Sequence, residues 1–308
     1  MHTRKKITIV GSGNVGSQAA FWAAAKELGD IALIDILEGI PQGKALDIYE
    51  STPLLGSDCK ITGTNDYEDT KDSDIVIITA GIARKPGMTR EDLLAINKKI
   101  VSEVTEKIVK YSPNCILIII SNPLDAMVYV AHKVSGFPKS RIMGMAGVLD
   151  TARYRSFVAE ALDVSVKDVN AFVLGSHGDT MIPMSGYANI NGVPLNDLLS
   201  ASKIKEIEQR TRDGGAEIVN LLKTGSAFFA PGVAAIEMAE SIIKDKKRVL
   251  PVCAYLDGEY GIKGIFMGVM AELGKNGVEK IIEFKLNKEQ QMQFNKTAEH
   301  IKSLVSGL

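Results

Sequence analysis

Six residues near the start of the chain read Gly11-Ser12-Gly13-Asn14-Val15-Gly16, in the spacing G-x-G-x-x-G. A β-branched run at residues 7–10 predicts a strand directly before them, and a helical pattern at residues 15–28 follows. In such a turn the first glycine allows a sharp bend, the second lets a pyrophosphate approach, and the third lets helix and strand pack closely. The helix N-terminus then offers free N–H groups to the phosphates. The segment predicts a dinucleotide-binding turn.

An acidic residue lies at the distance that such a turn requires. Asp35 ends the second predicted strand, 19 residues after Gly16. A carboxylate there accepts hydrogen bonds from a ribose hydroxyl and repels a 2′-phosphate. The next residues, Ile36 and Leu37, offer no cation for such a phosphate. The glycines alone fit an ordinary turn and Asp35 alone fits a solvated strand end, but together they predict NAD in preference to NADP.

The first half of the chain alternates short apolar runs with helical patterns. Strands are predicted at residues 7–10, 31–35, 60–63, 74–80 and 115–121, and helices at residues 15–28, 42–49 and 91–110. Nearly continuous apolar runs are typical of strands covered on both faces. Their alternation with helices indicates right-handed crossovers and an open parallel sheet. We therefore predict an α/β fold with a doubly wound Rossmann-type domain over residues 1–147.

After Gly147 the pattern changes to α+β. Helices are predicted at residues 149–162, 201–223, 233–244 and 288–305, and short strands at 169–174, 249–255 and 264–270. Asn191-Gly192 between apolar flanks is typical of a hairpin turn. We predict a second domain over residues 148–308. Because no linker rich in Pro, Gly or Ser separates the halves, we expect them to pack tightly.

Composition excludes several classes of function. The 308 residues carry 36 basic and 37 acidic side chains, a net charge of −1, which argues against a nucleic-acid partner bound through a basic surface. The apolar run at 115–120 has six residues, and such a run is too short for a membrane span. The N-terminus lacks the apolar stretch of a signal peptide, so we expect a cytoplasmic protein. Three distant cysteines match neither a disulfide framework nor a metal site, so no metal is predicted.

A basic loop follows the fourth predicted strand. Residues 81–90 carry Arg84, Lys85 and Arg90 and no acidic residue, with glycines at 81 and 87. Loops at the carboxyl ends of parallel strands bind ligands, and arginine offers a planar fork that matches carboxylates. Such a loop can also close over a site. A solvated basic loop is the alternative. Thr89 and Asp92 have the spacing of a capping box for the next helix.

Three polar residues of the second half form a candidate site. His177 is one of four histidines and lies between Gly175 and Gly178, which leave room around an imidazole. Asp150 and Arg153 share a helix face. Their spacing fits a surface salt bridge. It fits equally a site in which Asp150 orients His177 and Arg153 binds a substrate carboxylate.

Five segments together resemble the lactate and malate dehydrogenase family. They are residues 11–16, 83–90, 121–125 (Ser-Asn-Pro-Leu-Asp), 147–153 and 175–179, in family order over the whole chain. The resemblance implies a Rossmann-type NAD domain, an α+β catalytic domain and a 2-hydroxy acid substrate. It further implies a homotetramer or a dimer, and a place in the tricarboxylic acid cycle.

The resemblance also implies roles for single residues. His177 would be the general acid and base, with Asp150 as its partner, and Arg153 would bind the substrate carboxylate. Arg90 would polarise the reacting carbonyl. Further cofactor contacts would come from Asn97, Ile120, Ser121 and Asn122. Asn122 would also touch the substrate and precede a cis bond to Pro123.

Arg84 indicates which substrate is expected. Lactate-active members of the family typically carry glutamine at this position. Oxaloacetate has a second carboxylate, and an enclosed charge needs a partner to offset its desolvation. We therefore expect (S)-malate and oxaloacetate as substrates, and Arg84 would penalise pyruvate. A lactate-active enzyme and a catalytically silent nucleotide-binding relative are the alternatives.

Overall fold

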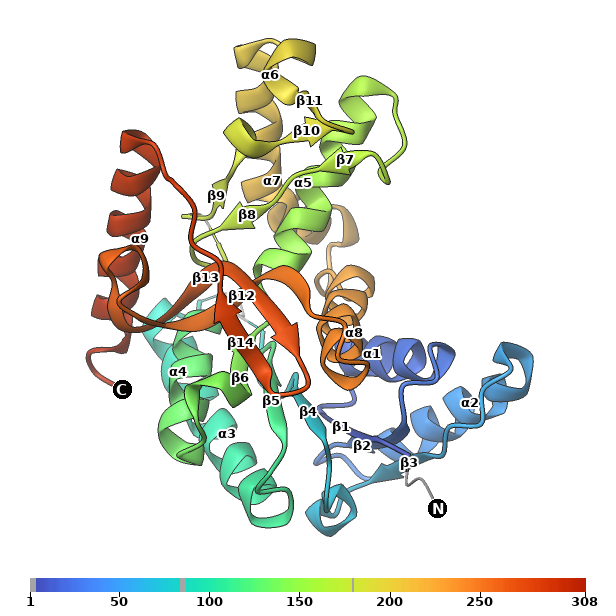
Figure 1. The fold of residues 1–308 in the computed structure, drawn as a ribbon. Helices are drawn as coiled ribbons and strands as arrows, with labels where there is room; N and C mark the ends of the chain where they lie inside the picture. Colours follow the sequence, from blue (N-terminus) through green and yellow to red (C-terminus); the bar gives the residue numbers. More distant parts are fainter. Residues whose placement is uncertain (1–3, 84–86, 179) are drawn as a thin grey trace.

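A mixed sheet of nine strands runs through the protein (Figure 1). The computed structural model describes residues 4–83, 87–178 and 180–308. Six strands of the first half are parallel and lie side by side in the order β3-β2-β1-β4-β5-β6. They are β1 (Lys6–Val10), β2 (Asp30–Ile34), β3 (Ile61–Thr64), β4 (Ile75–Ile78), β5 (Ile116–Ile119) and β6 (Ile142–Gly144). This is the strand order of a doubly wound dinucleotide-binding fold, so the predicted fold class is confirmed.

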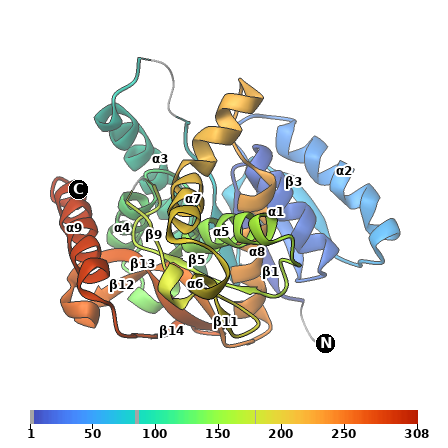
Figure 2. The ribbon, with the colours of Figure 1, turned by 90° about the horizontal axis from the view of Figure 1, so that it is seen from above.

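Helices cover both faces of the parallel strands (Figures 1 and 2). Those of the first half are α1 (Asn14–Ala25), α2 (Ile40–Leu55), α3 (Arg90–Tyr111) and α4 (Leu124–Ser135). Helix α1 packs against α2 and α8 on one face, and α3 packs against α4 on the other. The sequence did not indicate α4. Seven of its side chains are buried, and an apolar run such as residues 126–131 fits a buried strand as well as a buried helix.

The second half adds three antiparallel strands to the same sheet. They are β12 (Arg248–Asp257), β13 (Lys263–Gly274) and β14 (Gly277–Ile281). Strand β12 joins the parallel strands by pairing Cys253 with Gly144 of β6. A Cβ at Gly144 would lie 2.7 Å from Val128 Cγ2, so this junction requires glycine. The strands expected at 249–255 and 264–270 are therefore longer than predicted and extend one continuous sheet.

Of the rest of the second half, helices α5, α6 and α7 and strands β7–β11 stand above the sheet in Figure 1, while α8 lies beside α1 and α9 lies beside α4 and β13. The helices of this half are α5 (Gly147–Leu162), α6 (Leu195–Leu198), α7 (Ala201–Leu222), α8 (Phe229–Ile243) and α9 (Lys288–Val305). Short strands connect them: β7 (Val169–Asn170), β8 (Val173–Leu174), β9 (Ile182–Pro183), β10 (Asn189–Ile190) and β11 (Val193–Pro194). The strand predicted at 169–174 is thus divided in two. The predicted hairpin is confirmed, because Asn191 and Gly192 both have positive φ between β10 and β11.

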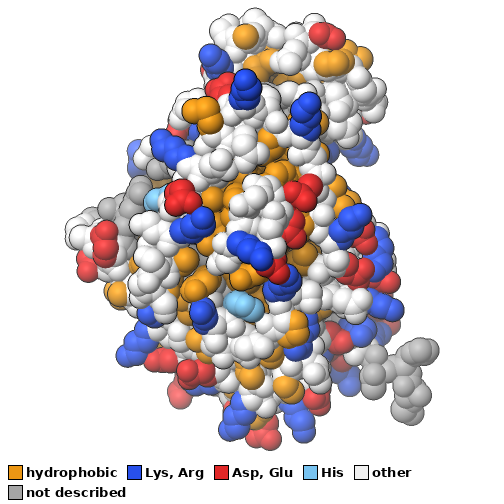
Figure 3. Space-filling view, turned by 60° about the vertical axis from the view of Figure 1, so that its left-hand side comes forward, with side chains coloured by type: hydrophobic (Ala, Val, Ile, Leu, Met, Phe, Trp, Pro, Cys, Tyr) orange, Lys and Arg blue, Asp and Glu red, His pale blue; other side chains and the backbone are white. Residues whose placement is uncertain are grey.

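Two hydrophobic cores support these parts. The larger one surrounds the sheet, and a smaller one around Tyr154, Val158, Ile204 and Ile207 lies where α5 packs against α7. On the face shown in Figure 3, acidic and basic side chains are intermingled. Within the described ranges, no helix is long and apolar enough to span a membrane. No cluster of three or more metal-binding side chains occurs there either.

Candidate functional site

The glycine turn between β1 and α1 has the geometry expected of a phosphate site. Gly11 has a φ of 101°, and a Cβ there would lie 2.5 Å from Thr79 Oγ1. A Cβ at Gly16 would lie 1.8 Å from the carbonyl oxygen of Gly11. These two glycines are required by the packing of the chain itself. A Cβ at Gly13 would meet no described atom within 4 Å, so this residue faces open space that a ligand can occupy.

Asp35 is held against this turn from the end of β2. Its Oδ2 accepts hydrogen bonds from the backbone N–H of Ser12 at 2.7 Å and from the Ser12 hydroxyl at 3.0 Å. Oδ1 accepts from the N–H of Leu37 at 3.2 Å. Burial acts to raise the pKa of Asp35, but these hydrogen bonds outweigh it and the pKa is lowered. Asp35 is therefore a carboxylate at neutral pH, as recognition of a ribose requires.

A lysine that the sequence analysis did not single out also reaches the turn. Lys44 of α2 donates a hydrogen bond from Nζ to the carbonyl oxygen of Ser12 at 2.6 Å. Ser12 is fully buried, with its N–H and hydroxyl on Asp35 and its carbonyl on Lys44. Ser12 thus fixes the shape of the turn. The pairing of Lys44 follows from tertiary contact, and spacing along the sequence contains no signal for it.

A cavity of about 510 Å³ opens beside the turn, at the carboxyl ends of β1, β2 and β4. Its lining includes five residues predicted to bind the cofactor: Gly11, Gly13, Asn14, Val15 and Asp35. Tyr67, Ile100 and Lys107 line it from one side, and Ser226 and Phe228 approach from the segment before α8. The cavity lies where the strand order reverses between β1 and β4, the usual ligand position in open α/β sheets.

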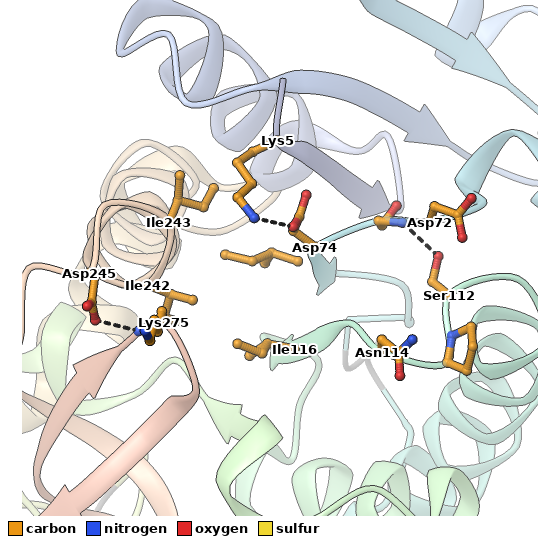
Figure 4. A pocket seen from close by; sticks show the side chains of 13 residues that line it. Lys5, Asp72, Asp74, Ser112, Asn114, Ile116, Ile242, Ile243, Asp245 and Lys275 are labelled. Carbon is orange, nitrogen blue, oxygen red and sulfur yellow. Dashed lines mark hydrogen bonds and ion pairs between the residues drawn. The ribbon is translucent and has the colours of Figure 1, made fainter. Parts of the chain in front are cut away.

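A second cavity, of about 480 Å³, lies at the amino ends of the parallel strands, opposite the first cavity (Figure 4). It is lined by residues that precede the parallel strands, among them Lys5, Asp74 and Asn114. Lys5 Nζ and Asp74 Oδ1 form an ion pair of 2.7 Å on one side of it. Because ligands of doubly wound sheets bind at the carboxyl ends, the first cavity is the candidate site.

The loop after β4 is fixed at its base by Asn97 of α3. The Asn97 Oδ1 accepts from the N–H of Ile82 at 2.8 Å, and Nδ2 donates to the carbonyls of Ile82 at 3.1 Å and Asn122 at 2.6 Å. Asn97 is 1% exposed, and both N–H groups of its amide donate in these bonds. Asn97 thus anchors the loop next to the cavity, and its expected contact with the cofactor stays a prediction.

The other end of that loop begins helix α3. Thr89 and Asp92 form the predicted capping box, with both reciprocal hydrogen bonds at 3.0 Å. Arg84 lies outside the described residues. Arg90 is the first residue of α3, and its side chain is likewise outside the described part.

Ile120 and Ser121, which follow β5 and were expected to contact the cofactor, are hydrogen-bonded to the end of β4 and to the loop after it. The N–H of Ile120 donates to Ile78 at 2.9 Å, and the Ser121 hydroxyl donates to the carbonyl of Ala80 at 2.5 Å. The peptide bond between Asn122 and Pro123 is cis, as the family resemblance implied. The side chain of Asn122 is exposed, while its carbonyl is held by Asn97.

Asp150, Arg153 and His177 meet in one cluster. The Oδ2 of Asp150 lies 2.9 Å from Nδ1 of His177, and its Oδ1 lies 3.1 Å from Nη1 of Arg153. Asp150 is 1% exposed, so this pair is no solvated salt bridge. One buried carboxylate therefore orients both an imidazole and a guanidinium.

The environment of His177 favours its protonated form. The negative charge of Asp150 raises the pKa of His177 above its ordinary value, while burial and the charge of Arg153 oppose the rise. Nε2 has no hydrogen-bond partner among residues 4–83, 87–178 and 180–308. Gly175, two residues before His177, is tied to Gly268 of β13 by a pair of hydrogen bonds of 2.9 Å. The ring can thus exchange a proton through Nε2 from a fixed position.

Gly214 of α7 makes room for Arg153, which the sequence analysis did not foresee. A Cβ at Gly214 would lie 3.1 Å from Arg153 Cδ, whereas one at Gly215 would lie 3.8 Å from Nη2, an ordinary contact. Glycine is unfavourable inside a helix, so a pair of them in the middle of α7 indicates a close approach by another element.

Both halves of the chain match models of known protein families. Residues 5–144 match the family model "lactate/malate dehydrogenase, NAD binding domain", and residues 147–306 match "lactate/malate dehydrogenase, alpha/beta C-terminal domain". A malate dehydrogenase of Heliobacterium modesticaldum is 55% identical over 303 residues, 98% of each chain. One of Chlorobium limicola is 57% identical over 294 residues, 95% of each chain.

Solved structures of two other proteins have the same fold as this chain. The malate dehydrogenase of Cryptosporidium parvum superposes with a TM-score of 0.97 at 48% identity, covering 99% of both chains. The lactate dehydrogenase of the same organism, complexed with lactic acid and NAD, reaches a TM-score of 0.96 at 44% identity, covering 100% of this chain and 98% of that one.

Proposed function

Because the chain belongs to the lactate/malate dehydrogenase family, we propose that it is an NAD-dependent oxidoreductase that interconverts (S)-malate and oxaloacetate. The observation that carries the chemistry is the cluster of Asp150, Arg153 and His177. It combines a proton-exchanging imidazole with a guanidinium that matches a carboxylate. The relatives at about 55% identity favour malate over lactate.

The glycine turn and Asp35 fit NAD. Gly13 faces open space, the first turn of α1 has no side-chain cap on its N–H groups, and Asp35 is ionised beside the cavity. We propose that the cofactor is held by residues Gly11, Ser12, Gly13, Asn14, Val15, Gly16, Asp35, Asn97, Ile120, Ser121 and Asn122. In this set Ser12 and Asn97 act by fixing the backbone. When bound there, NAD would supply the hydride acceptor for oxidation and the hydride donor for reduction.

His177 moves the proton. In oxidation, Nε2 of the neutral imidazole accepts the proton of the C2 hydroxyl, and Asp150 stabilises the imidazolium that forms. In reduction, the protonated His177 donates that proton to the carbonyl oxygen. The raised pKa of His177 favours the form needed for reduction.

Three arginines bind the substrate in this proposal. Arg153 forms a bidentate pair with the C1 carboxylate, since Asp150 fixes one edge of its guanidinium. Arg90 stabilises the charge that develops at the carbonyl oxygen. Arg84 pairs with the second carboxylate, which distinguishes oxaloacetate from pyruvate.

An assay with two substrates tests this function. Oxidation of NADH, followed by its absorbance, is expected to be faster with oxaloacetate than with pyruvate. Faster turnover of pyruvate would assign the lactate-active alternative. Absence of turnover with either substrate would assign a silent nucleotide-binding relative.

The remaining proposals concern the organisation of the protein. We propose a division into an NAD-binding domain, residues 1–147, and a catalytic domain, residues 148–308.

Apolar side chains exposed on α1 and α2 (Trp22, Leu46, Tyr49, Leu54) support association with further copies, as a homotetramer or a dimer. Sedimentation equilibrium would measure that state. A cytoplasmic location and a place in the tricarboxylic acid cycle complete the proposal.

A further inference from the structure

His177 lies in the loop of a hairpin whose strands are very short. Strands β8 and β9 pair in an antiparallel register through two residues each, and Leu174 and Ile182 are the pair next to the loop. The loop turns through Gly175 and Gly178, whose φ values are 90° and 148°. A two-stranded hairpin is marginally stable by itself in water, so the loop that carries His177 needs a further restraint.

A pair of hydroxyl groups continues the register of this hairpin into the loop. The pairing of Leu174 with Ile182 places Ser176 opposite Thr180, two positions further along each side. Ser176 Oγ and Thr180 Oγ1 lie 2.6 Å apart, and either hydroxyl can donate the hydrogen bond. Ser176 is buried and Thr180 half-buried, so water competes little for this bond. Hydrogen bonds between Ser and Thr on facing strands stabilise a sheet, and this one joins the two sides of the loop around His177.

Both ends of this hydrogen bond rest on other parts of the fold. Gly175, the residue before Ser176, exchanges two backbone hydrogen bonds of 2.9 Å with Gly268 of β13. The carbonyl oxygen of Thr180 accepts a hydrogen bond of 3.2 Å from Oγ1 of Thr297 in α9, which is buried. The loop is thereby tied to the large sheet on one side and to the last helix on the other.

These attachments supply a restraint that Asp150 does not. Asp150 of α5 holds the imidazole through Nδ1, but a hydrogen bond to the ring leaves free the main chain that carries it. Glycine on both sides of His177 adds to that freedom. A catalytic group displaced by about 1 Å can cost about 10²-fold in rate. Arg153 belongs to α5 and not to the loop, so a loosened loop should impair proton transfer and spare carboxylate binding.

We propose that Ser176 and Thr180 are positioning residues for His177: the hydrogen bond between their hydroxyls closes the loop and holds Nε2 where it exchanges a proton with the substrate. This inference rests on the proposed function of His177 as acid and base. Neither hydroxyl takes part in the proton transfer itself. Because the loss of either one breaks the same bond, the two residues act as a unit.

Five single variants and one double variant test the pair. Ser176→Ala and Thr180→Val each remove one hydroxyl, and the double variant S176A/T180V removes both. Ser176→Thr and Thr180→Ser keep a hydroxyl at each position and serve as rescue variants. The matched control is Thr8→Val in β1. Thr8 is fully buried, and its Oγ1 lies 2.7 Å from Oγ of Ser73, so T8V breaks a similar hydroxyl pair in the first half of the chain.

We expect kcat for oxaloacetate reduction to fall about tenfold in S176A and in T180V, with KM within about twofold. The double variant should lose no more than the more impaired single variant, since both break one bond. S176T and T180S should keep kcat within about twofold of the wild type. T8V should leave kcat unchanged, although it also loses a buried hydrogen bond.

Hydrogen exchange measures the loop without turnover. The backbone N–H of Met181 donates to the carbonyl of Gly178 at 3.0 Å, inside the segment that the hydroxyl pair closes. Local opening of the loop exposes this N–H to exchange. By NMR on the protein without cofactor, we expect its exchange to be about tenfold faster in S176A and T180V and unchanged in T8V.

A kcat within twofold of the wild type in both S176A and T180V would overturn the proposal. Losses that add in the double variant, an equal loss in T8V, or unchanged exchange at Met181 would overturn it as well. Should T180V fail to fold, S176A breaks the same bond from the other side. If His177→Asn retained full turnover, the acid–base role would fail while the exchange data still showed whether the hydroxyl pair closes the loop.

Discussion

Nδ1 of His177 lies 2.9 Å from Oδ2 of Asp150, although the two residues are carried by a loop and a helix 27 positions apart. The same carboxylate holds Nη1 of Arg153 through its other oxygen. Proton transfer and substrate binding are thus aligned by one buried group. Displacing Asp150 would disturb both functions, whereas changing His177 or Arg153 should disturb one.

Replacing His177 by asparagine should remove proton transfer and leave cofactor binding intact. Asn cannot exchange a proton in this pH range, and general acid–base catalysis contributes about 10²–10⁴-fold. We expect kcat to fall by that factor, while the Kd for NADH, measured by fluorescence titration, changes less than about twofold. Turnover close to that of the wild type would exclude His177 as the acid and base.

Replacing Asp150 by asparagine should lower the pKa of His177, because the charge of Asp150 is the main cause of its rise. Oxaloacetate reduction needs the imidazolium, so kcat near neutral pH should fall about 10²-fold. The decline of activity with rising pH should also begin at a lower pH. The pH profile of kcat measures both effects, and an unshifted profile would contradict them.

Asp150→Asn should also change how the free energy of unfolding depends on pH. A histidine whose pKa is raised by folding stabilises the fold below its unfolded pKa of about 6.5, and that contribution disappears as pH rises through the folded pKa. Wild type and D150N should therefore differ more in free energy of unfolding at pH 5.5 than at pH 8.5. Urea denaturation at the two pH values measures this difference.

Much of the fold could be predicted because it depends on local pattern. The turn from Gly11 to Gly16, the parallel strands and helix α9 follow from periodicity and glycine spacing. Helix α4 could not, since its apolar run fits a buried strand equally well, and neither could the pairing of Cys253 with Gly144 that joins the two halves. Such long-range pairing depends on the assembled sheet.

The residues of the candidate site could likewise be predicted only in part. His177, Asp150 and Arg153 could be found from residue type and family resemblance. The attachment of Lys44 to Ser12 could not, since this contact joins two segments with no pattern in common. Asn97 was found, but its amide proves to hold the backbone of Ile82 and Asn122.

Asn97→Ala should loosen the loop after β4. It removes three hydrogen bonds and leaves the carbonyls of Ile82 and Asn122 without this donor, at a cost of about 1–3 kcal/mol in unfolding free energy. KM for oxaloacetate should rise, since the loop carries Arg84 and Arg90. Thr89→Ala is the control, because it weakens the cap of α3 at the other end of the loop. An equal rise of KM in both variants would argue against a specific anchor.

Arg84→Gln should shift substrate preference from oxaloacetate toward pyruvate. The variant leaves the second carboxylate of oxaloacetate without a cation and removes an unpaired charge from the pyruvate complex. The ratio of kcat/KM for the two substrates should change by about 10²-fold or more. Lys85→Gln, the neighbouring position, is the control for a general loss of positive charge. An unchanged ratio in R84Q would refute the assignment.

Asp35→Asn should weaken the discrimination against NADP. Asn keeps an oxygen that can accept from Ser12, so the turn is retained, while the charge that repels a 2′-phosphate is lost. Asp35→Ala removes the charge and the bonds to Ser12 together, so it should weaken discrimination as D35N does and in addition weaken the binding of both cofactors. The ratio of kcat/KM for NAD and NADP should fall in D35N by about tenfold. A ratio unchanged in D35N but reduced in D35A would show that the hydrogen bonds to Ser12, and not the charge, select the cofactor.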